Sequence, residues 1–387
     1  MTEKEYDIEI YGLAYGGNGV GKLDGKVCFV EDALPGEKVR FVKNTEKKNF
    51  TIGQTTQILT ASNDRVKPEC PHYGKCGGCQ YQHLSYEKEV FYKSEQVREI
   101  LARIGGFKKY KFQNIIPSPA HYNYRSSITL HKSKTGFGYF SKDNETIIDI
   151  ARCPLAREEI NAAIGTLSRS ERKDDITMKS DKKGNVWVEG YPGHRFFKDE
   201  FLGTELTFAP LAFSQGNREI ATSLVEQLRA CIKEEEEDSD VLFDLYCGVG
   251  FFGMLLRDLF KSVIGIDNSR VAVDCATATK KDLKSDNIKF YRSETDKGFP
   301  GYYEKFKGKT NTVLLDPPRS GINKTIAKNL LELKDANSLY YISCDPSKLA
   351  RDAKLLTQDK IWTLERVACF DMFPRTKHIE SIALFKR

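Results

Sequence analysis

The sequence has no long hydrophobic segment. No run of 18 apolar residues occurs among its 387 residues, which excludes the usual membrane-spanning helix. The first residues, MTEKEYDIEIYGLAYGG, are acidic and lack the apolar core of a secretory signal, so we expect a cytoplasmic protein. Ten cysteines are too few for a disulfide scaffold. Without a signal peptide they are more typical of thiols, metal ligands or catalytic groups.

The excess of positive charge is small and unevenly distributed. The net charge is +6 overall, with −1 in residues 1–60, +6 in residues 61–200 and +1 in residues 201–387. Within residues 88–134, ten Lys or Arg residues stand against three Glu. A local basic surface suits a polyanion such as nucleic acid, although a solvated helical face would have the same composition.

The N-terminal part of the chain has the pattern of short strands. In residues 1–60, runs such as Tyr6-Asp-Ile-Glu-Ile10 alternate polar and apolar residues, and glycine clusters separate them. Short strands at even spacing predict a small OB-like β-barrel. Residues 61–84 and 112–212 are mixed strands and loops, and we expect them to form a central α+β domain.

The C-terminal part alternates strands with helices. From Val241 onward, apolar strands are followed by helical segments, which predicts a parallel, Rossmann-like α/β sheet. Residues 85–104 have helical periodicity and end at Gly105-Gly106. We therefore assign residues 213–387 to the α/β domain, with the helical region 85–111 packed onto it.

A glycine-rich turn follows the strand that begins at Val241. In Asp244-Leu-Tyr-Cys-Gly-Val-Gly-Phe-Phe252, the glycines let a ligand approach the backbone at the carboxyl edge of the sheet. The second strand ends at Asp267, where a carboxylate can accept hydrogen bonds from both hydroxyls of a ribose. The turn has no Walker lysine and lacks the third glycine of the dinucleotide fingerprint. S-adenosylmethionine therefore fits better than NAD.

Two later strand ends carry reactive side chains. The segment Val313-Leu-Leu-Asp-Pro-Pro-Arg319 places Asp316 at the open edge of the sheet, and the next strand places Cys344 there, before an Asp-Pro turn. The related motif N-P-P-Y belongs to amino-group methyltransferases, so a nitrogen target stays open at this point. Such an enzyme would not need a thiol at Cys344.

Taken together, these motifs resemble one family. The D-x-x-C-G-x-G-F turn, L-L-D-P-P-R, Y-I-S-C-D-P-S-K-L-A-R-D and His378-Ile-Glu380 occur in the order found in RNA uracil-5-methyltransferases, and the similarity covers nearly the whole chain. The resemblance implies an N-terminal TRAM barrel, a central iron–sulfur domain and a C-terminal class I methyltransferase domain. It also implies methyl transfer from S-adenosylmethionine to C5 of a uridine in RNA, with 23S ribosomal RNA favoured over transfer RNA.

This reaction needs two protein groups. C5 of uracil is a poor nucleophile until a thiolate adds to C6, and a base must later remove the C5 proton. By match to the family motifs, Cys344 is the nucleophile and Glu380 the base, with His378 as a candidate to orient it. The same match assigns the cofactor pocket to Gln215, Tyr246, Phe251, Asp267, Glu294 and Asp316. Phe251 replaces the Asn or Thr that is frequent in relatives, which leaves it a backbone or stacking role.

Four cysteines have the spacing of a metal site. Cys70, Cys76 and Cys79 form C-x5-C-x2-C, and Cys153 follows in Arg152-Cys-Pro154. Four thiolates can hold a [4Fe–4S] cluster or a zinc ion, and spacing alone does not choose between them. The resemblance implies the cluster. The spacing differs from the C-x3-C-x2-C of radical enzymes, so we expect a role in holding the central domain together.

Aromatic and basic residues in the central region are candidates for RNA contact. Aromatic rings stack on unpaired bases, and Arg or Lys hold phosphates. These residues are Tyr122, Tyr124, Arg125, Phe137, Tyr139 and Phe140. The same tyrosines could instead fill the core of a sheet. We expect a monomeric enzyme, and the alternative from another class is a non-catalytic RNA-binding or redox protein.

Overall fold

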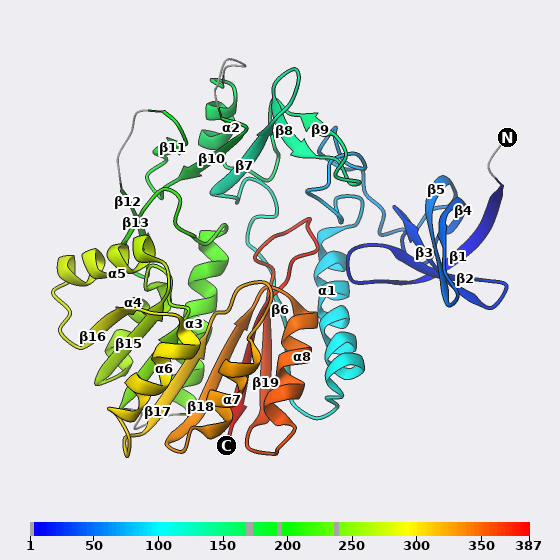
Figure 1. Cartoon of the computed structure of the whole chain (residues 1–387). Coiled ribbons are helices and arrows are strands. Elements are labelled where there is room, and N and C mark those ends of the chain that lie inside the picture. Colours follow the sequence, from blue (N-terminus) through cyan, green and yellow to red (C-terminus); the bar gives the residue numbers. More distant parts are fainter. Residues whose placement is uncertain (1–3, 168–172, 192–195, 236–239) are drawn as a thin grey trace.

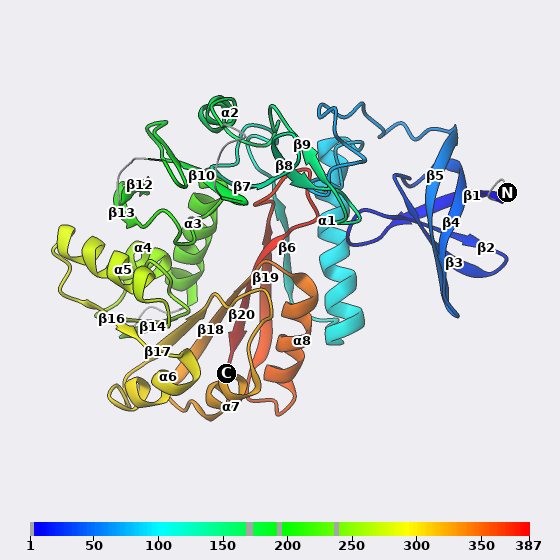
Figure 2. The ribbon, with the colours of Figure 1, turned by 45° about the horizontal axis from the view of Figure 1, so that its top comes forward.

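The computed structural model describes residues 4–167, 173–191, 196–235 and 240–387. Figure 1 shows a β-barrel on one side of the molecule, a small sheet on top and a large α/β sheet below. Helix α1 (Tyr86–Ile100) runs between the barrel and the large sheet, and this arrangement is also clear in Figure 2. No helix in these described ranges is both long and apolar enough to cross a membrane.

The N-terminal strands close into a barrel in the order β1-β2-β3-β5-β4. The strands are β1 (Glu5–Leu13), β2 (Gly19–Leu23), β3 (Lys26–Glu31), β4 (Lys38–Glu46) and β5 (Phe50–Thr60). Ile8, Val30 and Phe41 are among the buried residues that fill the interior. A Cβ at Gly53 would lie 2.3 Å from the carbonyl oxygen of Val42, so this close approach of two strands requires glycine. The expected β-barrel is confirmed.

The expected helix over residues 85–104 is present, with a change of winding near its end. Helix α1 continues into a π-helical turn over Leu101–Gly105, and Gly106 ends it with a φ of 79°. The chain then enters β6 (Lys111–Ile116), which pairs in parallel with the large sheet. Residues 112–116 thus lie in the large sheet, whereas the expected boundary places them in the central domain.

The small upper sheet has five strands in the order β11-β10-β7-β8-β9. Helix α2 (Glu158–Ile164) packs on it through a core that includes Ile160 and Met178. A separate hairpin, β12 (Phe197–Phe201) and β13 (Thr204–Phe208), leads towards the large sheet. The sheet strands are β7 (Ser127–Lys132), β8 (Phe137–Phe140), β9 (Ile147–Asp149), β10 (Asp175–Ser180) and β11 (Val186–Val188).

The large sheet has eight strands in the order β16-β15-β14-β17-β18-β20-β19-β6. Strands β16, β15, β14, β17 and β18 are parallel to one another, and β20 inserts antiparallel between β18 and β19. The strands are β14 (Val241–Leu245), β15 (Ser262–Asp267), β16 (Ile288–Arg292), β17 (Asn311–Leu315), β18 (Ala336–Ser343), β19 (Thr363–Phe370) and β20 (Glu380–Lys386). The expected α/β fold is confirmed.

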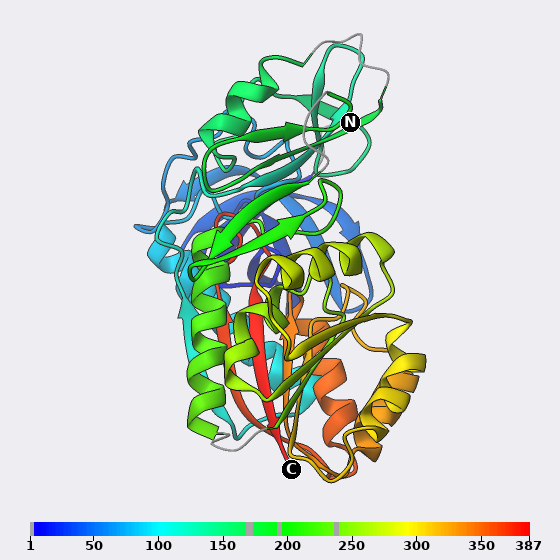
Figure 3. The same ribbon diagram turned by 90° about the vertical axis from the view of Figure 1, so that its left-hand side faces the viewer.

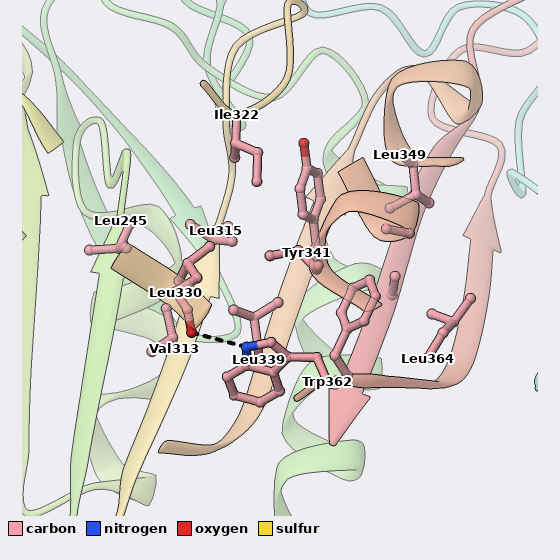
Figure 4. Packing of buried hydrophobic residues seen from close by; sticks show 14 of the residues in the cluster. Leu245, Val313, Leu315, Ile322, Leu330, Leu339, Tyr341, Leu349, Trp362 and Leu364 are labelled. Atoms are coloured by element: carbon pink, nitrogen blue, oxygen red, sulfur yellow. Dashed lines mark hydrogen bonds between the residues drawn. The ribbon is translucent and has the colours of Figure 1, made fainter. Parts of the chain in front are cut away.

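Helices cover both faces of this sheet, as the side view in Figure 3 shows. One core lies under α3 (Arg218–Glu235), α4 (Phe251–Leu256) and α5 (Arg270–Asp282). The other lies under α1, α6 (Thr295–Glu304), α7 (Lys324–Glu332) and α8 (Pro346–Thr357). In the second core the indole N–H of Trp362 donates to the carbonyl of Leu330 at 3.0 Å, which satisfies its one polar atom (Figure 4). A sheet packed on both faces is a rigid support for the groups at its edge.

Candidate active site

The glycine-rich turn lies at the carboxyl edge of β14. Tyr246, Gly248 and Gly250 have φ angles of 62°, 54° and 77°. A Cβ at Gly248 would meet no atom within 4 Å, so the space above the turn is open, whereas a Cβ at Gly250 would lie 2.6 Å from the ring of Phe290. The turn is therefore tightly packed at Gly250, whereas a ligand can approach its backbone at Gly248.

Asp267 is fixed beside this turn. Its Oδ2 accepts from the Gly248 N–H at 2.9 Å, and its Oδ1 accepts from the Ser269 N–H at 2.8 Å. The side chain therefore ends β15 next to the open space above Gly248. This is the position expected for a carboxylate that binds ribose hydroxyls.

Two further carboxyl groups lie on the same edge. Burial raises the pKa of Asp244 to about 8, with smaller effects from Asp316 and Asp267. Burial and the neighbouring Asp267 raise the pKa of Asp316 to about 7. The carboxyl groups of Asp267 and Asp316 therefore suit a cationic ligand at the open turn, whereas Asp244 is fully buried and accepts from the Gly253 N–H at 2.9 Å.

The remaining residues expected in the cofactor pocket differ in their surroundings. Glu294 precedes α6 and accepts from the Asn268 side chain at 3.4 Å, near the end of β15. Phe251 is buried, with its ring edge-on to Phe201 at 5.0 Å, so its side chain belongs to the core under α4. Gln215 precedes α3, and its carbonyl oxygen accepts from the Ser126 hydroxyl at 3.3 Å.

Cys344 and Glu380 meet across two neighbouring strands. Strands β18 and β20 pair Ser343 with Ser381, so Cys344 and Glu380 occupy the next position of the same register. Burial raises the pKa of Cys344 to about 11, and Glu380 and Asp316 add to this effect while Arg319 opposes it. Burial and Asp316 also hold the pKa of Glu380 well above its usual range. Cys344 is therefore a protonated thiol at neutral pH in the ligand-free protein, and burial favours the neutral form of Glu380.

The turn after Cys344 is held by a helix cap. Asp345 is the N-cap of α8, and its Oδ1 accepts from the N–H groups of Ser347 at 2.8 Å and Lys348 at 3.2 Å. Pro346 at the first helical position suits this start. The thiol is thus fixed between a central strand and a capped helix.

His378 lies two residues before Glu380 and is half-buried. Burial lowers its pKa to about 4, and the nearby Arg319, Lys377 and Arg125 act in the same direction. Its ring packs against Phe373, with 5.9 Å between the ring centres. At neutral pH this histidine is therefore uncharged.

A tyrosine of the barrel reaches the same place. Tyr15, in the loop between β1 and β2, packs against the core of the large sheet. Burial raises its pKa, and the nearby Asp345 and Cys344 act in the same direction. Sequence reasoning missed this residue because strand alternation in the barrel carries no information about a site more than 300 residues away.

A buried network of charges joins helix α1 to the start of the loop between β19 and β20. Lys93 on α1 contacts Asp371 at 2.7 Å and Glu89 at 2.8 Å, and all three side chains are fully buried. The Tyr86 hydroxyl also donates to Asp371 at 2.8 Å. Arg375 contacts Glu89 at 3.2 Å. The sequence does contain an indication of this network, because Glu89 and Lys93 lie on the same face of the helix as the apolar Val97 and Ile100.

Cys70, Cys76, Cys79 and Cys153 are all free thiols that line one cavity of about 390 Å³. The Gln82 side chain donates to Cys79 Sγ at 3.2 Å, and the Gly78 N–H donates to Cys76 Sγ at 3.4 Å. In the part of the chain that the structure describes, no group of three or more His, Cys, Asp or Glu side chains is close enough to hold a metal ion. Within the described residues, the four thiols thus share a cavity without forming a ready-made metal site.

The aromatic residues considered for RNA contact separate into two kinds. Tyr124 is buried, and its hydroxyl donates to the carbonyl of Pro374 at 2.9 Å, while Phe137 is buried in the core of the upper sheet. Tyr122 and Tyr139 are half-buried, and Phe140 is 41% exposed. Phe213, beside Gln215, was not among these candidates and is 72% exposed. Only the exposed rings are available to stack on a base.

Comparisons with known proteins identify similar chains. The family model described as tRNA (Uracil-5-)-methyltransferase matches residues 205–387, and that of the TRAM domain matches residues 1–50. An uncharacterized RNA methyltransferase of Aquifex aeolicus is 32% identical over 100% of this chain and 99% of its own length. A 23S rRNA (uracil(1939)-C(5))-methyltransferase of Legionella pneumophila is 29% identical over 98% of this chain and 96% of its own.

One solved structure is similar over the whole chain. The Pyrococcus abyssi tRNA (uracil-54, C5)-methyltransferase, in complex with S-adenosyl-L-homocysteine, covers 98% of this chain and 100% of its own, with a TM-score of 0.73. Its sequence is 24% identical, so this likeness shows the fold.

Proposed function

Because the chain belongs to the RNA uracil-5-methyltransferase family, we propose that it transfers a methyl group from S-adenosylmethionine to C5 of a uridine in RNA. The preferred substrate is 23S ribosomal RNA, since the Legionella relative that matches almost end to end acts on that RNA. Transfer RNA is the second candidate, because the archaeal enzyme of the same fold modifies it. Methylation of separate pools of unmodified 23S RNA and transfer RNA, followed by mapping of the methylated nucleotide, distinguishes the two.

The carboxyl edge of β14 to β17 fits this cofactor. The open backbone at Gly248 leaves space for an adenosine, and Asp267 lies where it can accept from ribose hydroxyls. When bound, S-adenosylmethionine supplies an electrophilic methyl group on a cationic sulfur. The neighbouring Asp316 favours that positive charge, and the bound cation would in turn lower the raised pKa of Asp316.

On the target side, Cys344 acts as the nucleophile. Its thiolate adds to C6 of the uracil, and the resulting electron density at C5 forms the new bond to the methyl carbon, while the bond from that carbon to the sulfonium sulfur breaks and leaves its electron pair on sulfur. In the ligand-free protein the thiol has a pKa of about 11, so it must lose its proton before attack. Arg319 favours the thiolate, and a bound cation nearby would act in the same direction.

Glu380, in its carboxylate form, then accepts the C5 proton. The electron pair of that C–H bond re-forms the C5–C6 double bond, and the Cys344 sulfur leaves from C6. A carboxylate whose pKa is held high is a stronger base than an ordinary glutamate, which suits removal of a proton from carbon. His378 is uncharged at neutral pH, so it adds no positive charge that would weaken Glu380 as a base.

The observation that carries the proposal is the position of Cys344 opposite Glu380, with Asp316 influencing both groups. A nucleophile and a separate base are the two protein groups that this reaction requires. An amino-group methyltransferase would need neither a thiol here nor a carboxyl group opposite it.

The substitution Glu380→Gln tests the mechanism. Attack and methyl transfer precede proton removal, so the variant should methylate RNA and then remain attached through Cys344, visible as a shifted band on a denaturing gel. Turnover should fall about 10²–10⁴-fold. Glu365→Gln, on the neighbouring strand β19, is the matched control and should release product normally. Normal turnover of Glu380→Gln without an adduct would contradict the assignment of the base.

We also propose that Cys70, Cys76, Cys79 and Cys153 hold a [4Fe–4S] cluster. The four free thiols line the same cavity, and the resemblance to the family favours a cluster over a single zinc ion there. Protein purified without oxygen should be brown and contain about four irons per chain. Stoichiometric zinc without iron would contradict the cluster.

The exposed rings of Phe213 and Phe140 are the proposed contacts for unpaired bases. A uridine inside a helix cannot reach Cys344, so the target must lie in a loop or be flipped out. Phe213 belongs to the segment that contains Gln215 and leads into α3, so a base stacked on it would lie close to the methyltransferase domain.

A further inference from the structure

The loop between β19 and β20 ends at the proposed base. It spans residues 371–379, and we call it the catalytic loop. Glu380 is the first residue of β20 and pairs with Phe370, the last residue of β19. The position of the Glu380 backbone therefore depends on how this loop leaves one strand and returns to the next.

Gln80, directly after Cys79, binds the catalytic loop at two points. Its backbone N–H donates to the carbonyl of Arg375 at 2.9 Å, and its side-chain Oε1 accepts from the N–H of Lys377 at 2.9 Å. Gln80 is itself fixed, because its Nε2 donates to the carbonyl of Gly77 at 2.9 Å and its carbonyl accepts from the Tyr73 hydroxyl at 3.0 Å. Residues 70–80, which we call the cysteine segment, thus present a preformed support to the loop.

The part of the loop held by Gln80 has an unfavourable backbone conformation. Arg375 has a φ of 68°, which a residue with a Cβ adopts only when its surroundings hold it there. Its N–H donates to Glu89 at 2.7 Å, and its Nη1 donates to the carbonyl of Leu84 at 2.8 Å. The Gln80 bonds to Arg375 and Lys377 lie on either side of Thr376, which in turn accepts from the His378 N–H at 3.3 Å.

The proposed nucleophile does not depend on these contacts. Cys344 is fixed by β18 and by the Asp345 cap of α8, which lie outside the catalytic loop. The cysteine cavity, in contrast, is lined by both Gln80 and His378. A disturbance at Gln80 should therefore reach Glu380 before it reaches Cys344.

We propose that Gln80 is a positioning residue for the base, and that the cysteine segment fixes the catalytic loop so that Glu380 can remove the C5 proton. This rests on the proposed function, because it needs Glu380 to be the base. It gives the cysteine segment a role in one step of the reaction, the release of methylated RNA, and not in attack by Cys344.

The test compares Gln80→Met and Gln80→Glu with the control Gln57→Met, an exposed glutamine on β5. Met has a similar size but cannot accept from Lys377, so turnover should fall about 10- to 100-fold, the effect of a small misplacement of a catalytic group. The covalent RNA adduct should accumulate, while RNA affinity, iron content and thermal midpoint stay at the control values. Gln80→Glu retains an acceptor for Lys377 and should lose clearly less turnover than Gln80→Met.

The outcomes separate this inference from the assignment of the base. If Glu380→Gln accumulates adduct but Gln80→Met releases product normally, the positioning role is overturned and the base stands. If Glu380→Gln itself turns over normally, the assignment of the base fails first. A parallel loss of iron or RNA affinity in Gln80→Met would place the defect in the cysteine site and overturn the proposal, as would equal impairment of the Met and Glu variants.

Discussion

The two halves of the active site are built in different ways. The cofactor half consists of the glycine turn, Asp267 and Asp316, which all lie within residues 244–316 on adjacent strands. The target half consists of Cys344 and Glu380, and its supports come from the other end of the chain: Gln80 and Lys377, which form a hydrogen bond, are 297 residues apart. The first half is formed by one edge of the large sheet. The second requires the barrel, the cysteine segment and the α/β domain to pack against one another.

Their electrostatics differ as well. The cofactor half brings the carboxyl groups of Asp267 and Asp316 to an open turn, which suits a cationic ligand. In the target half, Cys344 is protonated and His378 is uncharged at neutral pH, and burial favours the neutral form of Glu380. The charges that support this half, Lys93, Glu89 and Asp371, are buried behind it. Damage to the target half should therefore leave cofactor binding nearly intact.

The largest effect is expected for Cys344→Ala. Removal of the thiol removes the covalent route, so methylation should be lost, while cofactor affinity measured by calorimetry should stay within a few-fold of wild type. Cys369→Ala, a buried cysteine on β19, controls for loss of a thiol near the site. Near-normal methylation by the Cys344 variant would contradict the mechanism and the separation of the two halves.

The next effect concerns the buried network. Lys93→Met leaves Glu89 and Asp371 buried without their shared cation, which should lower the free energy of unfolding by about 3–5 kcal/mol in urea titration. Lys88→Met on the same helix is the control, because Lys88 is exposed and its contact with Asp64 is 3.6 Å long. Equal stability of the two variants would show that the network does not support the target half.

The protonation state of Cys344 can be measured directly. Only the thiolate reacts with iodoacetamide, and a pKa of about 11 leaves little thiolate at neutral pH. In cofactor-free protein the alkylation rate at Cys344, followed by mass spectrometry, should rise about tenfold per pH unit between pH 7 and 9. Arg319→Gln should lower the rate at each pH, since Arg319 favours the thiolate. A plateau above pH 8 would contradict the raised pKa.

A smaller effect is expected at Tyr15, which extends the target half into the barrel. Tyr15→Ala removes a ring beside Cys344 and should lower turnover about tenfold, the size of one lost aromatic contact to a base. Tyr11→Ala is the control, because Tyr11 lies on the same barrel and is 61% exposed. If the two variants behave alike, Tyr15 is not part of the active site, and the barrel contributes only to RNA binding.

The cofactor half is also the part that could be predicted from the sequence. Strand alternation identified the barrel, and the glycine turn with its downstream Asp267 identified the sheet edge, because each signal lies within a short segment. Cys344 and Glu380 were singled out through family motifs. Their register across β18 and β20 could not be predicted locally, since β20 inserts between two strands that precede it in sequence.

The supports of the target half could not be predicted for a related reason. Gln80 and Tyr15 show no unusual local pattern, and their partners are set only by the way the three regions pack. Glu89 and Lys93 did give a signal, as charged residues on an apolar helix face, but Asp371 is 278 residues from Lys93. Phe251 illustrates the opposite case, because its place in the motif pointed to the cofactor while its ring packs in the core.

The long separation between Gln80 and Lys377 has a consequence for folding. Contacts between residues far apart in sequence form slowly, because a long loop must close before any bond compensates for the lost entropy. Seven of the eight strands of the large sheet lie between Gln80 and Lys377 in the sequence, so this bond closes a loop that contains most of the sheet. The catalytic loop is therefore expected to be among the last parts of the molecule to become ordered on folding.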